Sequence, residues 1–347
     1  MFFIFFYKII LNKLYKYNNL YNINNHIIMI NNNKINENIS SYSEINDLNY
    51  HTDVIQCIKL LKNNYLISCS NDGSLIIYKK DSFEFLLQIR INDYWIYYLI
   101  ENYKNDIIFC SADCNIYVIN INFDINNIII KQIIKAHKAS VYKVIEFKKK
   151  LISISYDKKI IVYNNNNGIY DIETIINNSF DSECIMTITK TNQIISTFSF
   201  ANSIKFIDFY TLENKYVFKG FYVGYYNSII SKNEEKNLIF ITGTKRTENG
   251  ISIINFISFN ILAEIKFNDD GFINSLYYLN NDFLLVGKKI GDNVYAIKYK
   301  IEINELNYDL IEYGKIKAKS NEKIRTILIV NNYILLGCEN IKIFSLK

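Results

Sequence analysis

The sequence contains no proline, 11 glycines and a single tryptophan. Its favoured residues, among them Ile, Asn, Lys and Tyr, have codons rich in A and T, so the imbalance indicates an A+T-rich genome, such as that of a unicellular eukaryote, rather than a structural class. Without proline, turns must come from other residues. Asparagine tolerates left-handed backbone, so the pairs at 63–64, 280–281 and 331–332 are predicted to be turns and not disorder.

Motifs for metals, phosphates and disulfides are also missing. The six cysteines form no CxxC pair, neither GxxxxGK[ST] nor GxGxxG occurs, and His26, His51 and His137 are far apart. We therefore expect no metal and no cofactor. Several cysteines lie in apolar segments, where Cys acts as a small hydrophobic residue, so a reducing compartment, cytoplasmic or nuclear, is expected.

Charge gives weak evidence about partners. The net charge is +5, but the codon bias also inflates lysine, and the run Lys148-Lys149-Lys150 lies between two apolar segments with no regular interleaving of aromatic residues. This run is predicted to be a solvated turn, and direct contact with nucleic acid is not expected.

Residues 1–34 are predicted to be a leader, either disordered or a short helix. Residues 1–11 are apolar apart from Lys8, but there is no basic segment before them, no small-residue cleavage site, and too short an apolar run to span a bilayer. A targeting or membrane-touching segment is the alternative interpretation.

After residue 35 almost every apolar segment is short, rich in Ile, Tyr, Phe and Val, and bounded by Asn, Asp, Ser, Gly or Lys, which is typical of β-strands. The third strand of each unit ends in a bulky residue, and these residues recur at intervals of 41, 44, 44, 47, 43 and 47 positions. Seven such markers predict seven units of a β-propeller. They are Tyr78, Ile119, Tyr163, Ile207, Ile254, Ile297 and Phe344.

The predicted fold class is all-β: a seven-bladed propeller of four-stranded antiparallel blades over residues 35–347. The last unit supplies only three strands, ending with Ile341 to Ser345. A spare strand somewhere in 35–46 is expected to complete it, which would close the ring and remove both free sheet edges.

Residues 51–78 and 136–163 resemble blades of the WD-repeat β-propeller family. Each has a His near the start (His51, His137), an Asp in the turn between its second and third strands (Asp72, Asp157), and a closing bulky residue. Both depart from the family pattern, because Tyr78 and Tyr163 stand where the family has Trp.

His51, Ser68 and Asp72 have the residue types of a nucleophilic triad, and His137, Ser153 and Asp157 repeat them. Because an active site is usually needed once, repetition argues against catalysis. The resemblance implies that these residues form a structural hydrogen-bond network, with Tyr78 and Tyr163 either closing it through their phenols or leaving it open.

Other units have lost members of this set. Asp93 lies near the His position of the second unit, Ala201 at the Asp position of the fourth, and Ile207 at its Trp position. These blades are expected to depend on apolar burial, for which seven inter-blade cores are available.

In the resembling family, the loops between blades and the turns between the second and third strands form a frequent partner-binding face. The candidate residues here are Asn71, Tyr94, Trp95, Tyr142, Tyr156 and Phe200. The segment 244–250 of the fifth unit is longer and more polar than its equivalents, and is either a solvated hairpin or an insertion that reaches a partner.

The favoured function is a non-enzymatic WD-repeat scaffold that binds other proteins within a eukaryotic complex. The alternative is a phosphoinositide-binding propeller recruited to membranes. The relatives that bind these lipids carry adjacent arginines, whereas Arg90, Arg246 and Arg325 are separated here. No small-molecule substrate is expected.

Overall fold

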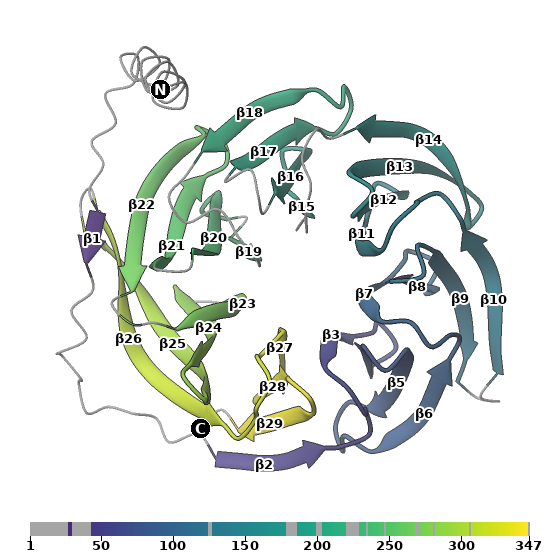
Figure 1. Ribbon diagram of the computed structural model, residues 1–347, viewed down its shortest axis with the longest axis horizontal. Coiled ribbons are helices and arrows are strands. Elements are labelled where there is room, and N and C mark those ends of the chain that lie inside the picture. Colours follow the sequence, from purple (N-terminus) through teal and green to yellow (C-terminus); the bar gives the residue numbers. More distant parts are fainter. Residues whose placement is uncertain are drawn as a thin grey trace, which may run out of the picture.

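A computed structural model describes residues 27–29, 43–123, 127–177, 186–198, 203–219, 229–233, 235–245, 248–267, 269, 271–279, 282–304 and 307–345. Its strands form seven antiparallel blades around a central axis (Figure 1), which confirms the predicted fold class. We denote the strands of each blade a to d from the centre outward.

The first three blades follow one another in the chain. Blade 1 consists of β3 (Ile55–Leu60), β4 (Tyr65–Ser70), β5 (Ser74–Lys79) and β6 (Phe85–Arg90). Blade 2 consists of β7 (Ile96–Glu101), β8 (Ile107–Ser111), β9 (Ile116–Asn122) and β10 (Asn127–Ile134). Blade 3 consists of β11 (Val141–Phe147), β12 (Lys150–Ser155), β13 (Lys159–Asn166) and β14 (Ile169–Asn177).

The next three blades repeat the same order. Blade 4 consists of β15 (Met186–Ile188), β16 (Gln193–Phe198), β17 (Ser203–Asp208) and β18 (Asn214–Lys219). Blade 5 consists of β19 (Ile229–Asn233), β20 (Leu238–Lys245), β21 (Glu248–Asn255) and β22 (Asn260–Phe267). Blade 6 consists of β23 (Phe272–Leu279), β24 (Phe283–Ile290), β25 (Asn293–Asn304) and β26 (Asn307–Ala318).

Blade 7 combines one N-terminal strand with the three last strands of the chain. Its strands a to c are β27 (Thr326–Val330), β28 (Tyr333–Gly337) and β29 (Ile341–Ser345), and its strand d is β2 (Ser43–Leu48), antiparallel to β29. The predicted N-terminal closing strand is thus confirmed, centred a few residues later than expected; residues 35–42 lie outside the described residues.

One additional strand was not anticipated. Most of residues 1–34 lies outside the described residues, but Ile27–Met29 forms the strand β1, not the predicted disorder or short helix. It pairs in parallel with β22 on the outer edge of blade 5 (Figure 1). Where segment 244–250 is described, it continues the hairpin of β20 and β21, with Lys245 opposite Glu248.

The hydrophobic core is divided among the interfaces between blades. The buried residues described here form seven clusters, each combining side chains from two neighbouring blades, as the sequence predicted. All seven marker residues lie on strands c and are buried. Leu48 of the closing strand is only 4% exposed and belongs to the core between blades 7 and 1. Burying such a side chain contributes roughly 1.5–3 kcal/mol.

Asparagine supplies the predicted turns at 63–64 and 331–332, whereas the predicted pair at 280–281 lies outside the described residues. The a–b turns of blades 1, 2, 4, 5 and 7 each contain one Asn with positive φ, between 53° and 64°: Asn64, Asn105, Asn192, Asn237 and Asn331. Asn is among the few residues that adopt this left-handed backbone readily. The a–b turn of blade 3 differs, because there Lys148 and Lys149 have positive φ.

Candidate protein-interaction face

The loops of a propeller belong to two faces. The d–a loops and b–c turns form one, which we call the upper face, and the a–b and c–d turns form the opposite, lower face. The predicted network starts in the loops of the upper face, where the described partner-binding candidates also lie.

In blade 3 a chain of hydrogen bonds runs from the b–c turn into the core. His137 Nδ1 lies 3.0 Å from both carboxylate oxygens of Asp157, and its Nε2 lies 2.6 Å from Ser153 Oγ. The Tyr163 hydroxyl lies 3.0 Å from the same Oγ. With a neutral imidazole, Tyr163 donates to Ser153, Ser153 to His137, and His137 to Asp157, so every member has a partner. The phenol of Tyr163 therefore closes the chain.

Blade 1 repeats this chain with a looser end. His51 Nδ1 lies 2.8 Å from Asp72 Oδ2, and Nε2 lies 2.7 Å from Ser68 Oγ, but Ser68 Oγ is 3.5 Å from the Tyr78 hydroxyl. Both His–Asp pairs are buried, and both serine side chains are inaccessible to solvent. The network ties the d–a loop to the b–c turn.

The pKa values of the network follow from this geometry. Burial alone would raise the pKa of Asp72, but the hydrogen bond and charge of His51, with the Ser74 hydroxyl, hold it well below its ordinary value. Burial lowers the pKa of His137, although Asp157 opposes the change. The pKa of Asp157 is also lowered: burial opposes this shift, and the backbone N–H of Lys138 and the His137 ring outweigh it.

A polar bridge also occurs in blade 2, which we expected to depend on apolar burial, so for this blade the expectation was wrong. In blade 2 the residue at the His position is Asn92, next to the predicted Asp93; its Nδ2 donates to Asp113 Oδ2 at 2.9 Å and to the Tyr117 hydroxyl at 3.1 Å. Asn92 precedes Asp113 by the same 21 residues that separate His51 from Asp72. This spacing could have revealed it.

In blades 6 and 7 the d–a loop is held by other chemistry. In blade 6 the fully buried Lys288 ammonium pairs with Asp269 at 2.5 Å, and it lies 4.2 Å from the centre of the Phe267 ring. In blade 7 Ser320 Oγ donates to Glu339 Oε1 at 3.3 Å. Ala201, at the Asp position of blade 4, lies outside the described residues.

Three of the predicted partner-binding residues belong to one row of rings on the upper face. Trp95 and Tyr97 meet edge to face with centroids 6.2 Å apart, Tyr97 and Tyr142 are 4.7 Å apart, and Tyr142 and Tyr156 are 4.2 Å apart. Trp95 is 48% and Tyr156 39% exposed. We call these four residues the aromatic row.

The aromatic row crosses from blade 2 to blade 3. Tyr97, which sequence reasoning missed, connects the two blades. It occupies the second position of β7, as Tyr142 does in β11, so a blade-by-blade alignment would have found it.

The other candidates have different surroundings. Tyr94 is exposed beside Trp95, and its backbone N–H donates to Asn92 Oδ1. Asn71, in the b–c turn of blade 1, accepts a hydrogen bond of 2.8 Å from Gln56 Nε2. The same turn packs against the following loop, because a Cβ on Gly73, whose φ is +78°, would lie 2.5 Å from the Asn92 carbonyl oxygen. Phe200 lies outside the described residues.

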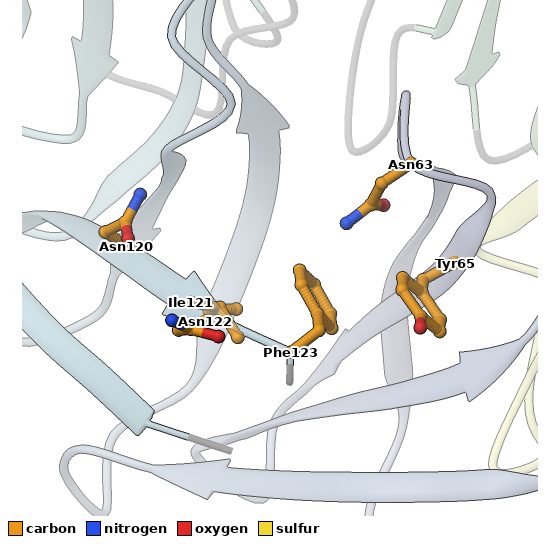
Figure 2. A pocket seen from close by; sticks show the side chains of 6 residues that line it. All are labelled: Asn63, Tyr65, Asn120, Ile121, Asn122 and Phe123. Carbon is orange, nitrogen blue, oxygen red and sulfur yellow. The ribbon is translucent and has the colours of Figure 1, made fainter. Parts of the chain in front are cut away.

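The lower face has an open hollow of about 400 Å³ (Figure 2). Its lining combines an aromatic pair with amides: Asn63, Tyr65, Asn120, Ile121, Asn122 and Phe123. The rings of Tyr65 and Phe123 are stacked face to face, with centroids 4.5 Å apart and planes at 8°.

The described residues contain no group of three or more His, Cys, Asp or Glu placed to hold a metal ion. Within the same residues, no helix has the length and apolar character needed to cross a membrane. The five cysteines that the structure describes are free thiols: Cys57, Cys69, Cys110, Cys114 and Cys338.

No protein-family model matches the chain, and no curated protein sequence matches it either. The fold and the side-chain geometry therefore carry the functional argument.

Proposed function

We propose that this chain is a WD-repeat-like propeller that acts as a non-enzymatic scaffold, binding other proteins through the upper face of blades 2 and 3. The observation that carries the proposal is the aromatic row. Large aromatic side chains dominate the energetics of protein interfaces, and here four of them form a continuous strip on a rigid sheet edge.

The rigidity of this strip supports the proposal. Trp95, Tyr97 and Tyr142 lie on or next to the inner strands β7 and β11, and Tyr156 begins the turn that contains Asp157. The His137 network fixes that turn to the preceding loop. A partner would therefore bind rings that are already ordered, which reduces the entropy lost on association.

The experiment is affinity purification of the full chain from its native cells, comparing wild type with Trp95→Ala/Tyr156→Ala. An Ile172→Ala/Ile175→Ala variant is the control, because both residues are exposed on the outer strand β14. Circular dichroism melts must show that all three proteins are folded. We expect a set of proteins that the row variant loses and the control retains; retention of all partners by the row variant would place the binding surface elsewhere.

The non-enzymatic part of the proposal is supported by the burial of the triad-like residues. Ser68 and Ser153 have no solvent-accessible surface, and their His partners bond to Asp72 and Asp157 beneath the face. In a hydrolase screen we expect no turnover. Turnover that His51→Ala abolishes in a folded protein would overturn this part of the proposal.

The phosphoinositide alternative lacks an observation that favours it. Arg90 pairs with Asp93 at the end of β6, whereas Arg325 precedes β27 at the inner edge of blade 7; Arg246 lies outside the described residues. Vesicle flotation with and without phosphoinositides separates the two classes. Phosphoinositide-specific flotation of the wild-type chain would favour the lipid function.

We propose a cytoplasmic or nuclear location, consistent with the free thiols.

A further inference from the structure

From the lower face, we infer a second binding surface, suited to a single-stranded nucleic acid, that crosses blades 1 to 4. It consists of lysine and tyrosine side chains that meet across successive blades, and we call it the lysine–tyrosine arc. Its members are Lys62, Tyr103, Lys104, Lys148, Lys149 and Tyr210.

The arc is continuous from blade to blade. Lys62, in the a–b turn of blade 1, donates to the Asn102 carbonyl at 2.6 Å in the equivalent turn of blade 2. The Tyr103 ring in that turn has Lys104 Nζ at 5.9 Å and Lys149 Nζ of blade 3 at 5.4 Å from its centre. Lys148 Nζ lies 4.7 Å from the ring centre of Tyr210 in blade 4 and donates to its hydroxyl.

Among the residues that the structure describes, the lysines of the arc form no ion pairs. Lys104 Nζ donates to the Asn167 carbonyl at 2.6 Å, Lys62 to neutral oxygens, and Lys148 to a phenol. Elsewhere many described lysines bond to carboxylates, as Lys150 does to Glu173 at 2.5 Å. Neutral acceptors leave the positive charge of the arc available to an anionic partner.

Two carboxylates of the described residues accept backbone N–H groups of the arc. Glu101 accepts the backbone N–H of Lys62 at 2.8 Å, and Glu146 accepts that of Tyr103 at 2.8 Å. Burial raises the pKa of Glu146, although the Tyr103 N–H, the Tyr170 hydroxyl and the charge of Lys62 oppose the shift. The four lysines of the arc outnumber these two carboxylates, so the described residues here carry a net positive charge.

The backbone of blade 3 supports a binding function. The turn between β11 and β12 has two residues, Lys148 and Lys149, with φ of 50° and 66°. Two positive φ values are the pattern of a type I′ hairpin, which favours Asn and Gly. The other described a–b turns place Asn or Asp at a left-handed position, so two lysines here sacrifice turn stability. Such strain is characteristic of binding sites.

Nucleic acid fits this arc better than a folded protein does. Lysine is depleted in protein interfaces, whereas single-stranded nucleic acids bind through lysines on phosphates and aromatic rings against bases. Tyr210 is 63% exposed. The hollow of Figure 2 shares the a–b turn of blade 1 with Lys62, so the arc leads to a second pair of rings at its end. Sequence inspection missed this interleaving, because the tyrosines come from neighbouring blades.

The test uses a fluorescently labelled 12-nucleotide oligouridylate and the full chain, with binding measured by anisotropy at 50, 100 and 200 mM salt. The first variant is Lys148→Asn/Lys149→Gly, which gives the turn the residues it favours and so maintains or raises the urea midpoint of unfolding. We expect it to weaken binding at least tenfold at 50 mM salt. We also expect the slope of log K against log salt to shrink by about 1.4, roughly 0.7 per phosphate contact.

Two further variants separate the chemistry. Tyr103→Leu is expected to weaken binding about tenfold through lost stacking, whereas Tyr103→Phe retains it. Lys317→Asn/Lys319→Asn, at exposed positions by the outer edge of blade 6, is the charge-matched control and is expected to bind as wild type does.

Absence of binding, or equal loss in the charge control, would overturn the inference. The arc could instead bind a polyglutamate peptide, or vesicles containing phosphatidylserine, as tightly as the oligouridylate, with no effect of Tyr103→Leu. That result would identify the partner as an acidic protein or a membrane and not a nucleic acid. These outcomes are independent of the upper face, since none of the variants alters the aromatic row.

Discussion

The Tyr163 hydroxyl lies 3.0 Å from Ser153 Oγ, and so a phenol ends the hydrogen-bonded chain that begins at Asp157. The corresponding pair in blade 1, Tyr78 and Ser68, is separated by 3.5 Å. Removing the two hydroxyls therefore compares a short hydrogen bond with a long, weak one in equivalent surroundings. Tyr163→Phe is expected to lower the free energy of unfolding by about 1–2 kcal/mol and Tyr78→Phe by clearly less.

Urea denaturation of the two variants measures this difference. Equal losses would mean that the hydroxyls contribute through packing only.

Acid should weaken the blade 3 network before the pH reaches the range of ordinary carboxyl groups. Because burial lowers the pKa of His137 in the folded chain, the unfolded chain binds more protons as the pH falls below about 6.5, and stability falls with it. The lowered pKa of Asp157 acts in the same direction only below about pH 4. Urea midpoints measured from pH 7.5 to 5 should therefore decrease.

His137→Asn provides the control for this prediction, since Asn92 fills the equivalent position of blade 2 and does not titrate. The variant should be less stable at pH 7.5 but should show a shallower dependence on pH. A rise in stability on acidification to pH 5 would contradict the assignment.

Closure of the ring depends on β2. Leu48 is buried in the core between blades 7 and 1, and Asp47 Oδ2 pairs at 2.8 Å with the nearly buried ammonium of Lys342. A chain starting at Asn49 loses both contacts and exposes the edge of β29, so we expect its melting temperature to fall by roughly 5–10 °C and aggregation to increase.

The matched control starts at Ser43 and retains β2. Differential scanning fluorimetry of both truncations measures the contribution of the strand itself. Identical melting temperatures would show that closure does not require β2.

The buried ion pair of blade 6 should respond asymmetrically to mutation. Lys288 has no accessible surface, whereas Asp269 is 22% exposed. Burial lowers the pKa of Lys288, and the bond to Asp269 opposes the shift. Asp269→Ala leaves a buried ammonium without its carboxylate and should cost about 3–5 kcal/mol.

Lys288→Met leaves a carboxylate that water reaches and that still accepts the Gly271 N–H at 2.9 Å, so its cost should be below roughly 1.5 kcal/mol. Urea denaturation at pH 7 measures the free energy of unfolding that each variant loses. A greater loss from Lys288→Met would contradict the interpretation of this pair.

The architecture could be predicted because it depends on patterns that repeat. Each of the seven units has short apolar strands, Asn turns and a bulky residue every 41 to 47 positions. The last unit lacks one strand, which indicates where the N-terminal strand must pair. By contrast β1 could not be predicted, since Ile27–Met29 carries no repeat signal and pairs with the outer edge of a distant blade.

The site could be predicted only where its residues are close in sequence or occupy equivalent blade positions. Trp95, Tyr142 and Tyr156 were found from their loops, but the contact of Tyr142 with Tyr97 depends on the packing of two blades. The ion pair between Asp269 and Lys288 could not be predicted from the motif. It lies in the same part of the blade as the His–Ser bond of blades 1 and 3, but it is made by different residue types. The spatial neighbours Lys149 and Tyr103 are likewise visible only after folding.

Site-specific photo-crosslinking in native cells tests the central claim most directly. A photoreactive phenylalanine analogue replaces Trp95 in one protein and Ile172, on the outer strand of blade 3, in another. The proposal predicts defined protein adducts from position 95 that Tyr156→Ala reduces, and none of them from position 172. Adducts from position 172 alone, or equal adducts from both positions, would contradict a scaffold whose working surface is the aromatic row.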